Sequence, residues 1–140
     1  MFRLDKDVLM IDYDGLNTNV ITTYGDVIFR GNNIKNILNE SCISFGSSLN
    51  GRIKGSKWAL KSKYKLPIVV SEKEKLVFFP VKEMGREIWI NFDMIKEVKK
   101  NKNIVKVEFK NGLKVDINVS YTIFNNQVLK ASRLWIIFLT

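Results

Sequence analysis

The sequence predicts an α+β fold, a mainly antiparallel sheet with one internal helix and a C-terminal helix packed on it. Residues 105–119 alternate apolar and polar side chains on both sides of Asn111-Gly112, which is typical of a β-hairpin with one buried face. Residues 34–45 and 124–135 instead place apolar side chains three and four positions apart, as amphipathic helices do. Strands that share one chain with separate helices indicate a layered α+β domain.

Three short strands are expected before the internal helix. Residues 8–13 and 20–24 are joined by a turn that contains Gly15, and residues 27–29 follow the turn dipeptide Gly25-Asp26. The helix begins after Asn32 or Asn33, which can cap it, and we expect it to end at Gly46. Its apolar positions are Ile34, Ile37, Leu38, Cys42 and Phe45.

Residues 45–56 predict a loop, because this stretch holds three glycines and three serines. A flexible connector is one interpretation. A phosphate-contacting loop is the other, since glycines allow close approach and hydroxyls and N–H groups bond phosphate oxygens. The G-K-[ST] ending of a nucleotide-hydrolysing P-loop is absent from the sequence.

The remaining elements follow in order. Residues 57–64, 67–70, 76–79 and 88–90 are expected strands, residues 94–98 fit a strand or a helix, and the hairpin has a two-residue turn of the primed type. Ser120 caps the final helix. Residues 134–139 are apolar nearly all round, so we expect them to be buried inside the domain or against a partner.

Length and composition predict a single domain over residues 1–140, with residues 46–56 as the one visible place for a subdivision. The longest apolar run has six residues, far below the roughly 20 needed to span a membrane, and residues 1–10 lack a signal-type apolar region. A cytoplasmic, nucleoid-associated protein is therefore expected.

The sequence argues against enzymatic chemistry, because it contains no histidine and a single cysteine. Cys42 fits a small buried hydrophobe better than a nucleophile. Asp12 and Asp14 alternate on an expected strand and could share a face, but solvated surface carboxylates are the commoner case. We expect no catalytic residues, no metal and no cofactor.

The charge is unevenly distributed along the chain. Residues 1–40 hold four basic and six acidic residues, a net charge of −2, whereas residues 41–140 hold 19 and 8, a net charge of +11. Residues 41–71 contain six cations and no acid. Such a stretch indicates a polyanionic partner, either nucleic acid or an anionic membrane. The preference for 18 lysines over 5 arginines also fits the codon bias of an AT-rich genome.

Residues 41–55 and the segment Lys65-Leu66-Pro67-Ile68-Val69-Val70 resemble the competence transcription factor ComK family of low-GC Gram-positive bacteria. The order continues through Phe78-Phe79-Pro80, Trp89-Ile90, Phe109-Lys110-Asn111-Gly112 and residues 119–128. The resemblance covers roughly residues 34–134, and residues 1–31 match only in general pattern.

This resemblance implies an activator of DNA-uptake and recombination genes that binds AT-rich promoter boxes from the minor-groove side as a homodimer or homotetramer. The minor groove of A·T DNA is narrow and strongly negative, so it attracts basic side chains. The expected DNA-contact residues, with Arg52 as the one to enter a groove, are Ser47, Ser48, Gly51, Arg52, Lys54, Lys57, Lys61 and Lys63.

Two expectations qualify this hypothesis. Thr140 lies about where the family's last helix leads into a tail associated with activation and with capture by a proteolytic adaptor, so the resemblance supports those two roles less directly than DNA binding. The alternative is a small pleckstrin-like module that binds an anionic membrane or a protein without DNA specificity, because a hairpin followed by an amphipathic helix also suits that architecture.

Overall fold

A computed structural model describes residues 2–140, which form nine β-strands, three α-helices and one 3-10 turn. The elements in chain order are β1 (Val8–Tyr13), β2 (Thr18–Thr22), β3 (Gly25–Phe29), α1 (Ile34–Ser44), α2 (Leu49–Leu60), β4 (Ile68–Ser71), β5 (Leu76–Glu83), β6 (Arg86–Asn91), η1 (Phe92–Met94), β7 (Ile95–Asn101), β8 (Ile104–Phe109), β9 (Lys114–Ile117) and α3 (Tyr121–Leu139). The α+β prediction is confirmed.

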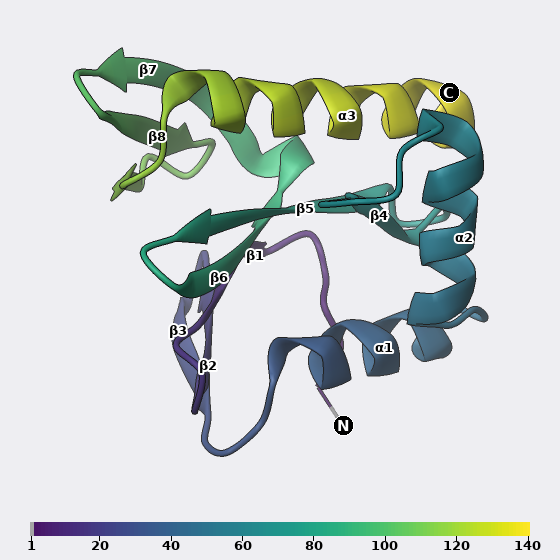
Figure 1. Cartoon of the computed structure of the whole chain (residues 1–140). Helices are drawn as coiled ribbons and strands as arrows, with labels where there is room; N and C mark the ends of the chain where they lie inside the picture. The colour runs from purple at the N-terminus through teal and green to yellow at the C-terminus, as the bar shows by residue number, and fades with distance from the viewer. Residues whose placement is uncertain (1) are drawn as a thin grey trace.

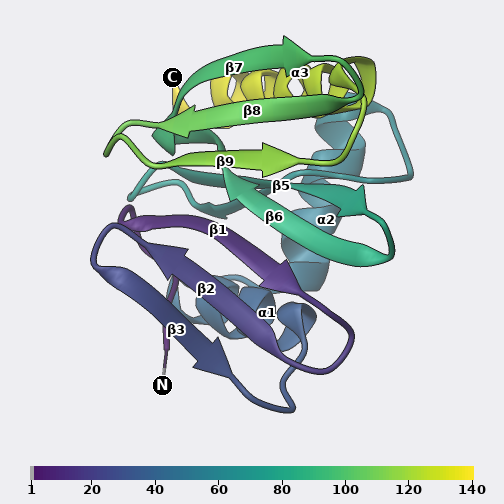
Figure 2. The ribbon, with the colours of Figure 1, turned by 90° about the vertical axis from the view of Figure 1, so that its left-hand side faces the viewer.

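The strands form two antiparallel sheets. The larger has the order β3-β2-β1-β6-β5-β4, and the smaller has the order β7-β8-β9. In Figures 1 and 2, α1 lies against one face of the large sheet, whereas α3 and the small sheet lie over the other. The large sheet is therefore covered on both faces at β4, which is buried throughout, whereas the opposite edge strand β3 is largely exposed.

Two hydrophobic cores fill these layers. The upper core lies between the large sheet and the layer of α3 and the small sheet, and the lower core lies between the large sheet and α1. In the upper core, Phe79 of β5 and Phe124 of α3 meet edge to face, with ring centroids 5.6 Å apart. Phe78, the next residue along β5, faces the lower core with α1, because successive strand residues point to opposite faces. The prediction that the C-terminal helix packs on the sheet is confirmed. Within residues 2–140, no helix is both long and apolar enough to cross a bilayer.

Helix α1 follows the predicted pattern. The Asn33 side chain caps it by accepting a hydrogen bond from the backbone N–H of Asn36, and Gly46 follows the helix with a φ of +88°. Cys42 is fully buried in the lower core, and burial raises the pKa of its thiol to about 11. The interpretation of Cys42 as a buried hydrophobe is confirmed.

The expected loop over residues 45–56 and the expected strand over residues 57–64 are both wrong, because α2 occupies most of this stretch. Ser48 begins the helix by accepting a hydrogen bond from Gly51 N–H over 3.0 Å. Inside it, the buried Ser56 hydroxyl donates to the Pro67 carbonyl over 2.6 Å, which ties α2 to the start of β4. This cap and the packing on β4 outweigh the low helix propensity of glycine and serine, so there are two internal helices rather than one.

The hairpin strands are confirmed, but the predicted two-residue primed turn is wrong. Phe109 N–H donates to Leu113 C=O over 2.8 Å, and three residues lie between them. Gly112 has a φ of +93°, whereas Asn111 does not enter the left-handed region that a primed turn requires at both central positions. The ambiguous segment after β6 resolves into η1 and the start of β7.

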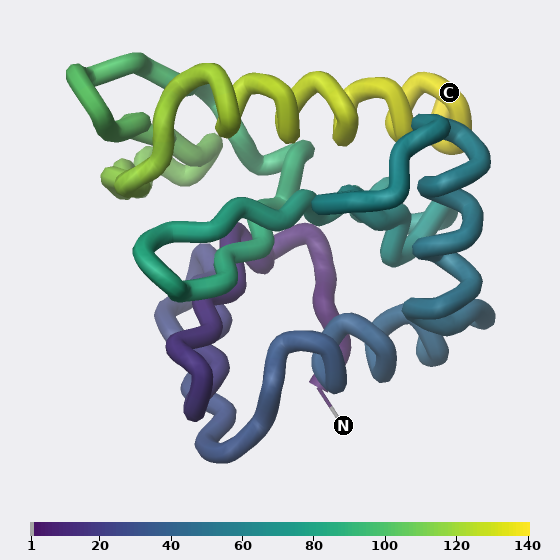
Figure 3. The backbone as a smooth tube through the Cα atoms, viewed as in Figure 1, coloured from purple at the N-terminus to yellow at the C-terminus, as the bar shows by residue number. Residues whose placement is uncertain are grey.

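The apolar end of α3 is only partly buried. Leu134 and Leu139 face the core, but Ile136 and Ile137 remain exposed in this chain. Figure 3 shows this end of α3 beside α2, where the rings of Trp58 and Phe138 lie 6.4 Å apart. Helix α2 therefore runs between α1 and the C-terminal end of α3.

Candidate nucleic-acid interface

Helix α2 presents one solvent-facing stripe of polar, basic and aromatic side chains. Residues three, four and seven positions apart share a helix face. The exposed members of this stripe are Asn50, Lys54, Lys57, Trp58 and Lys61. Trp58 is 73% exposed, which is unusual for a residue of this size and leaves its ring available for stacking.

The lysines of this stripe carry uncompensated charge. Within residues 2–140, Lys54, Lys57 and Lys61 have no carboxylate oxygen within 4.0 Å, and neither has Lys63 in the following loop. A full positive charge on each side chain creates a local potential that attracts a polyanion.

Four lysines on and next to the small sheet differ, because each has an acid beside it, whereas Lys100, Lys102 and Lys114 have no carboxylate oxygen within 4.0 Å among residues 2–140. The pairs are Lys96–Glu108 at 3.8 Å, Lys99–Glu97 at 3.9 Å, Lys106–Asp116 at 4.0 Å and Lys110–Asp93 at 3.4 Å. Exposed pairs of this kind add little stability, but each acid cancels much of the field of its lysine. The four paired lysines are thus chemically distinct from the lysines of the α2 stripe.

The predicted contact residues divide between two sides of α2. Lys54, Lys57 and Lys61 lie on the exposed stripe and Lys63 follows it, as described above. The other members, Ser47, Gly51 and Arg52, line a small hollow with Phe138 on the side toward α3, and Ser48 caps the helix. The Arg52 side chain is only 18% exposed and its Nη1 donates to Glu72 Oε1 over 2.9 Å.

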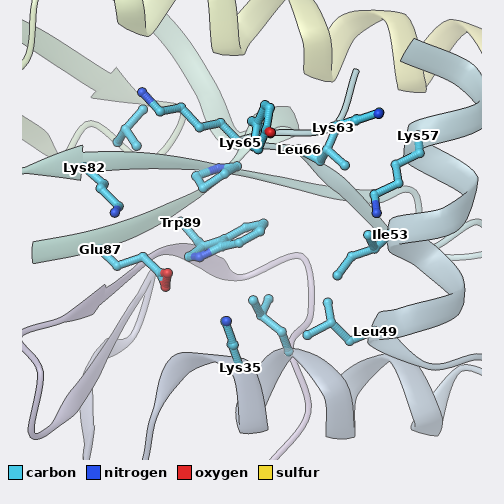
Figure 4. Close-up of a pocket in the computed structure, with 14 residues that line it drawn as sticks. Lys35, Leu49, Ile53, Lys57, Lys63, Lys65, Leu66, Lys82, Glu87 and Trp89 are labelled. Atoms are coloured by element: carbon cyan, nitrogen blue, oxygen red, sulfur yellow. The ribbon is translucent and has the colours of Figure 1, made fainter. Parts of the chain in front are cut away.

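Five basic residues outside the predicted set lie close to this surface. Lys35 of α1, Lys65 of the loop and Lys82 of β5 line the same groove as Lys57 and Lys63. Figure 4 shows these lysines around the groove. From α3, Lys130 donates to the Tyr64 carbonyl over 3.4 Å, and Arg133 shares a neighbouring hollow with Lys65.

Sequence reasoning missed most of these residues because they come from segments far apart in the chain. Lys65 lies in the acid-free stretch of residues 41–71 and could have been added from that pattern alone. Lys130 and Arg133 are three positions apart on the final helix, which is a weak signal for a shared polar face. Nothing in the sequence connects Lys35 or Lys82 with α2.

The sequence model of the family described as ComK protein matches residues 8–139, nearly the whole chain. The chain belongs to the ComK protein family. The suggested resemblance, which rested on residues 34–134, is confirmed and extends to the N-terminal strands.

A curated relative supports the same family. The competence transcription factor of Bacillus subtilis (strain 168) is 34% identical to this ComK-family chain over 101 residues, which are 70% of this chain and 53% of the relative. The chain thus spans about half the length of the curated relative it matches. No solved structure matches the chain significantly.

The two carboxylates considered for catalysis make structural contacts. Asp12 accepts hydrogen bonds from Arg86, and its pKa is raised because burial outweighs the attraction of that guanidinium. Asp14 accepts backbone N–H bonds from Leu16 and Asn17 at 2.9 and 2.8 Å, which lower its pKa. Asp12 therefore forms an ion pair, and Asp14 stabilises a turn.

Proposed function

We propose that this chain is a sequence-specific DNA-binding regulator of competence genes, those for DNA uptake and recombination, and that it binds AT-rich promoter boxes. Family membership and the relative's description as a competence transcription factor support the regulatory role. A regulator of this kind acts where the chromosome lies, so we place it in the cytoplasm. Its partner is double-stranded DNA.

The observation that carries this proposal is the set of unpaired lysines on α2 and the loop after it. Lys54, Lys57, Lys61 and Lys63 would contact phosphates or enter the narrow minor groove, whose potential is most negative in A·T sequences. The amide of Asn50 lies on the same stripe and can donate to the acceptors that A·T pairs present there.

The residues at the N-terminal end of α2 belong to the same proposal in a different role. Ser47, Ser48 and Gly51 lie at the N-terminal end of α2, where the helix dipole favours a phosphate. The N–H groups of Ser47 and Gly51 already donate to Cys42 C=O and Ser48 Oγ, so a phosphate would have to compete for them or bind the serine hydroxyls. Arg52 would reach DNA only by exchanging Glu72 for a phosphate. These four residues remain predictions.

We also propose assembly into a homodimer or homotetramer. Leu129, Ile136 and Ile137 leave an apolar patch on the outer side of α3, with exposed fractions of 53%, 64% and 43%. Light scattering after size-exclusion chromatography tests this point. A purely monomeric chain at the concentrations used for DNA binding would contradict it.

The DNA-binding proposal is tested by fluorescence anisotropy with an AT-rich promoter duplex. The double variant Lys57→Ala/Lys61→Ala should weaken binding by about tenfold or more and reduce the slope of log affinity against log salt by roughly 1.8, since each phosphate contact contributes about 0.9. The matched control is Lys96→Ala/Lys99→Ala, which removes two lysines that already stand beside acids.

Two results would contradict the proposal. Equal losses in the test and control variants would mean that net charge rather than this surface governs binding. Co-sedimentation with anionic vesicles, combined with no preference for AT-rich over GC-rich duplex, would favour the pleckstrin-like alternative.

A further inference from the structure

A groove opens between the large sheet and the two helices α1 and α2 and has a volume of about 570 Å³. Trp89 of β6 and Pro80 of β5, which are partners in the strand register, form its floor. Leu38 of α1 and Leu49 and Ile53 of α2 form the walls, as Figure 4 shows for the labelled residues. This volume and apolar lining are those of small-molecule sites rather than of surfaces that contact a duplex.

The rim of this groove is strongly basic. Five of its residues are lysines, and Glu87 is the single acid. Within residues 2–140 none of these six side chains has an opposite charge within 4.0 Å, although Lys82 and Glu87 are register partners on adjacent strands. The rim lysines, contributed by α1, α2, the following loop and β5, are Lys35, Lys57, Lys63, Lys65 and Lys82.

The floor contains a polar atom without a partner. Trp89 is only 9% exposed, and its indole Nε1 is buried with no hydrogen-bond acceptor among residues 2–140. Figure 4 shows the nitrogen edge of the indole on the side of Glu87. Nearly all buried donors in proteins are paired, so an unpaired indole N–H at a groove floor indicates that an acceptor is supplied there on binding.

From these three observations we infer that the groove is a binding site for a small organic anion with an apolar body. The body lies between Trp89 and Ile53, and the carboxylate or phosphate head lies among the rim lysines, with one of its oxygens accepting the Trp89 indole N–H. The combination is selective because a neutral apolar molecule leaves the lysines uncompensated, whereas a bare inorganic anion leaves the apolar walls in contact with water.

This site is physically connected to the proposed DNA surface. Lys57 and Lys63 belong to the groove rim and also to the set proposed to contact DNA. A bound anion therefore neutralises part of that set and weakens DNA binding. Only this regulatory consequence rests on the proposed function, because binding to the groove itself requires no DNA.

The test is calorimetric titration of the full chain with decanoate, with decanol and decyltrimethylammonium as neutral and cationic probes of the same chain length. Decanoate should bind more tightly than either by about tenfold or more.

The variant Lys35→Gln/Lys82→Gln changes the rim without touching the proposed DNA-contact set and should weaken decanoate binding by a similar factor. Trp89→Phe, which keeps an aromatic ring and removes the N–H, should weaken it several-fold.

The matched control is Lys96→Gln/Lys99→Gln, which makes the same change in net charge on the small sheet and should leave decanoate binding unchanged. Circular dichroism and thermal melting confirm that each variant is folded. Equal binding of decanol, an equal loss in the control, or no binding of decanoate overturns the inference.

DNA anisotropy with and without decanoate then tests the regulatory consequence. Decanoate should weaken DNA binding by the parent chain and have little effect on the Lys35→Gln/Lys82→Gln variant. If the chain binds decanoate but no DNA, the proposed function fails and the groove assignment stands. If it binds DNA but no decanoate, the reverse holds.

Discussion

Arg52 of α2 donates a hydrogen bond to Glu72, in the turn between β4 and β5, with 2.9 Å between Nη1 and Oε1. The arginine side chain is 18% exposed and the glutamate side chain 55%. This pair ties the helix of the proposed DNA surface to the edge of the large sheet. It also holds the residue that sequence reasoning singled out for entering a DNA groove.

Substituting either partner of this ion pair should separate its contribution to the free energy of unfolding from its contribution to DNA affinity. Arg52→Ala should lower the free energy of unfolding by about 1 kcal/mol, because it removes a partly buried charged hydrogen bond, and should weaken DNA binding. Glu72→Gln should lower stability less and strengthen DNA binding, since it removes an anion and frees the guanidinium. Thermal melts and DNA anisotropy measure both effects. Unchanged DNA affinity in both variants would confine Arg52 to a structural role.

Two glycines inside α2 should respond differently to alanine. A Cβ at Gly55 would lie 3.9 Å from Phe138, an ordinary contact, so Gly55→Ala should stabilise the chain by roughly 0.5–1 kcal/mol through the unfolded state. A Cβ at Gly51 would lie 3.2 Å from the hydroxyls of Ser47 and Ser48, one of which caps the helix. Gly51→Ala should therefore bring little or no gain. Denaturant unfolding compares the two, and equal gains would contradict the close contact at Gly51.

Gln127 of α3 joins three parts of the structure. Its buried amide donates to the carbonyls of Lys65 and Pro80 at 2.9 and 2.8 Å. Gln127→Leu leaves both carbonyls unpaired and should lower the free energy of unfolding by about 1–3 kcal/mol. Lys65 lies in the same loop as Lys63, which we propose contacts DNA. Loss of the Gln127 hydrogen bond to this loop should therefore weaken DNA binding as well. The exposed neighbour Asn126→Ala is the control, and an equal effect there would contradict a specific role for Gln127.

Cys42 should be unreactive in the folded chain. Its thiol pKa of about 11, against the usual 9.0, means that the folded state retains a proton that the unfolded state loses. The stability that the buried neutral thiol contributes is therefore present below about pH 9 and is lost as the pH rises toward about 11. Labelling with a chromogenic disulfide near pH 8 should be slow in buffer and fast in guanidinium chloride. Fast labelling of the native chain would show that this part of the core opens.

The elements that the sequence predicts well are those with short-range signals. The Asn33 and Ser120 caps and the spacing of Ile34, Ile37 and Leu38 each depend on residues within a few positions of one another. Helix α2 was mistaken for a loop because its local signals point the other way. Glycine and serine disfavour an isolated helix, and the Ser48 cap together with packing against β4, α1 and α3 offsets that preference.

The fold class, the family and the concentration of positive charge in residues 41–71 follow from the sequence alone. The tertiary structure decided which lysines act together. It paired Lys96 and Lys99 with acids, left Lys57 and Lys61 without an acid partner among residues 2–140, and brought Lys35 and Lys82 to the rim of a groove with Trp89 at its floor. The physical reason is that caps and periodicities depend on neighbours along the chain, whereas the field at a surface depends on distances between side chains that only folding sets.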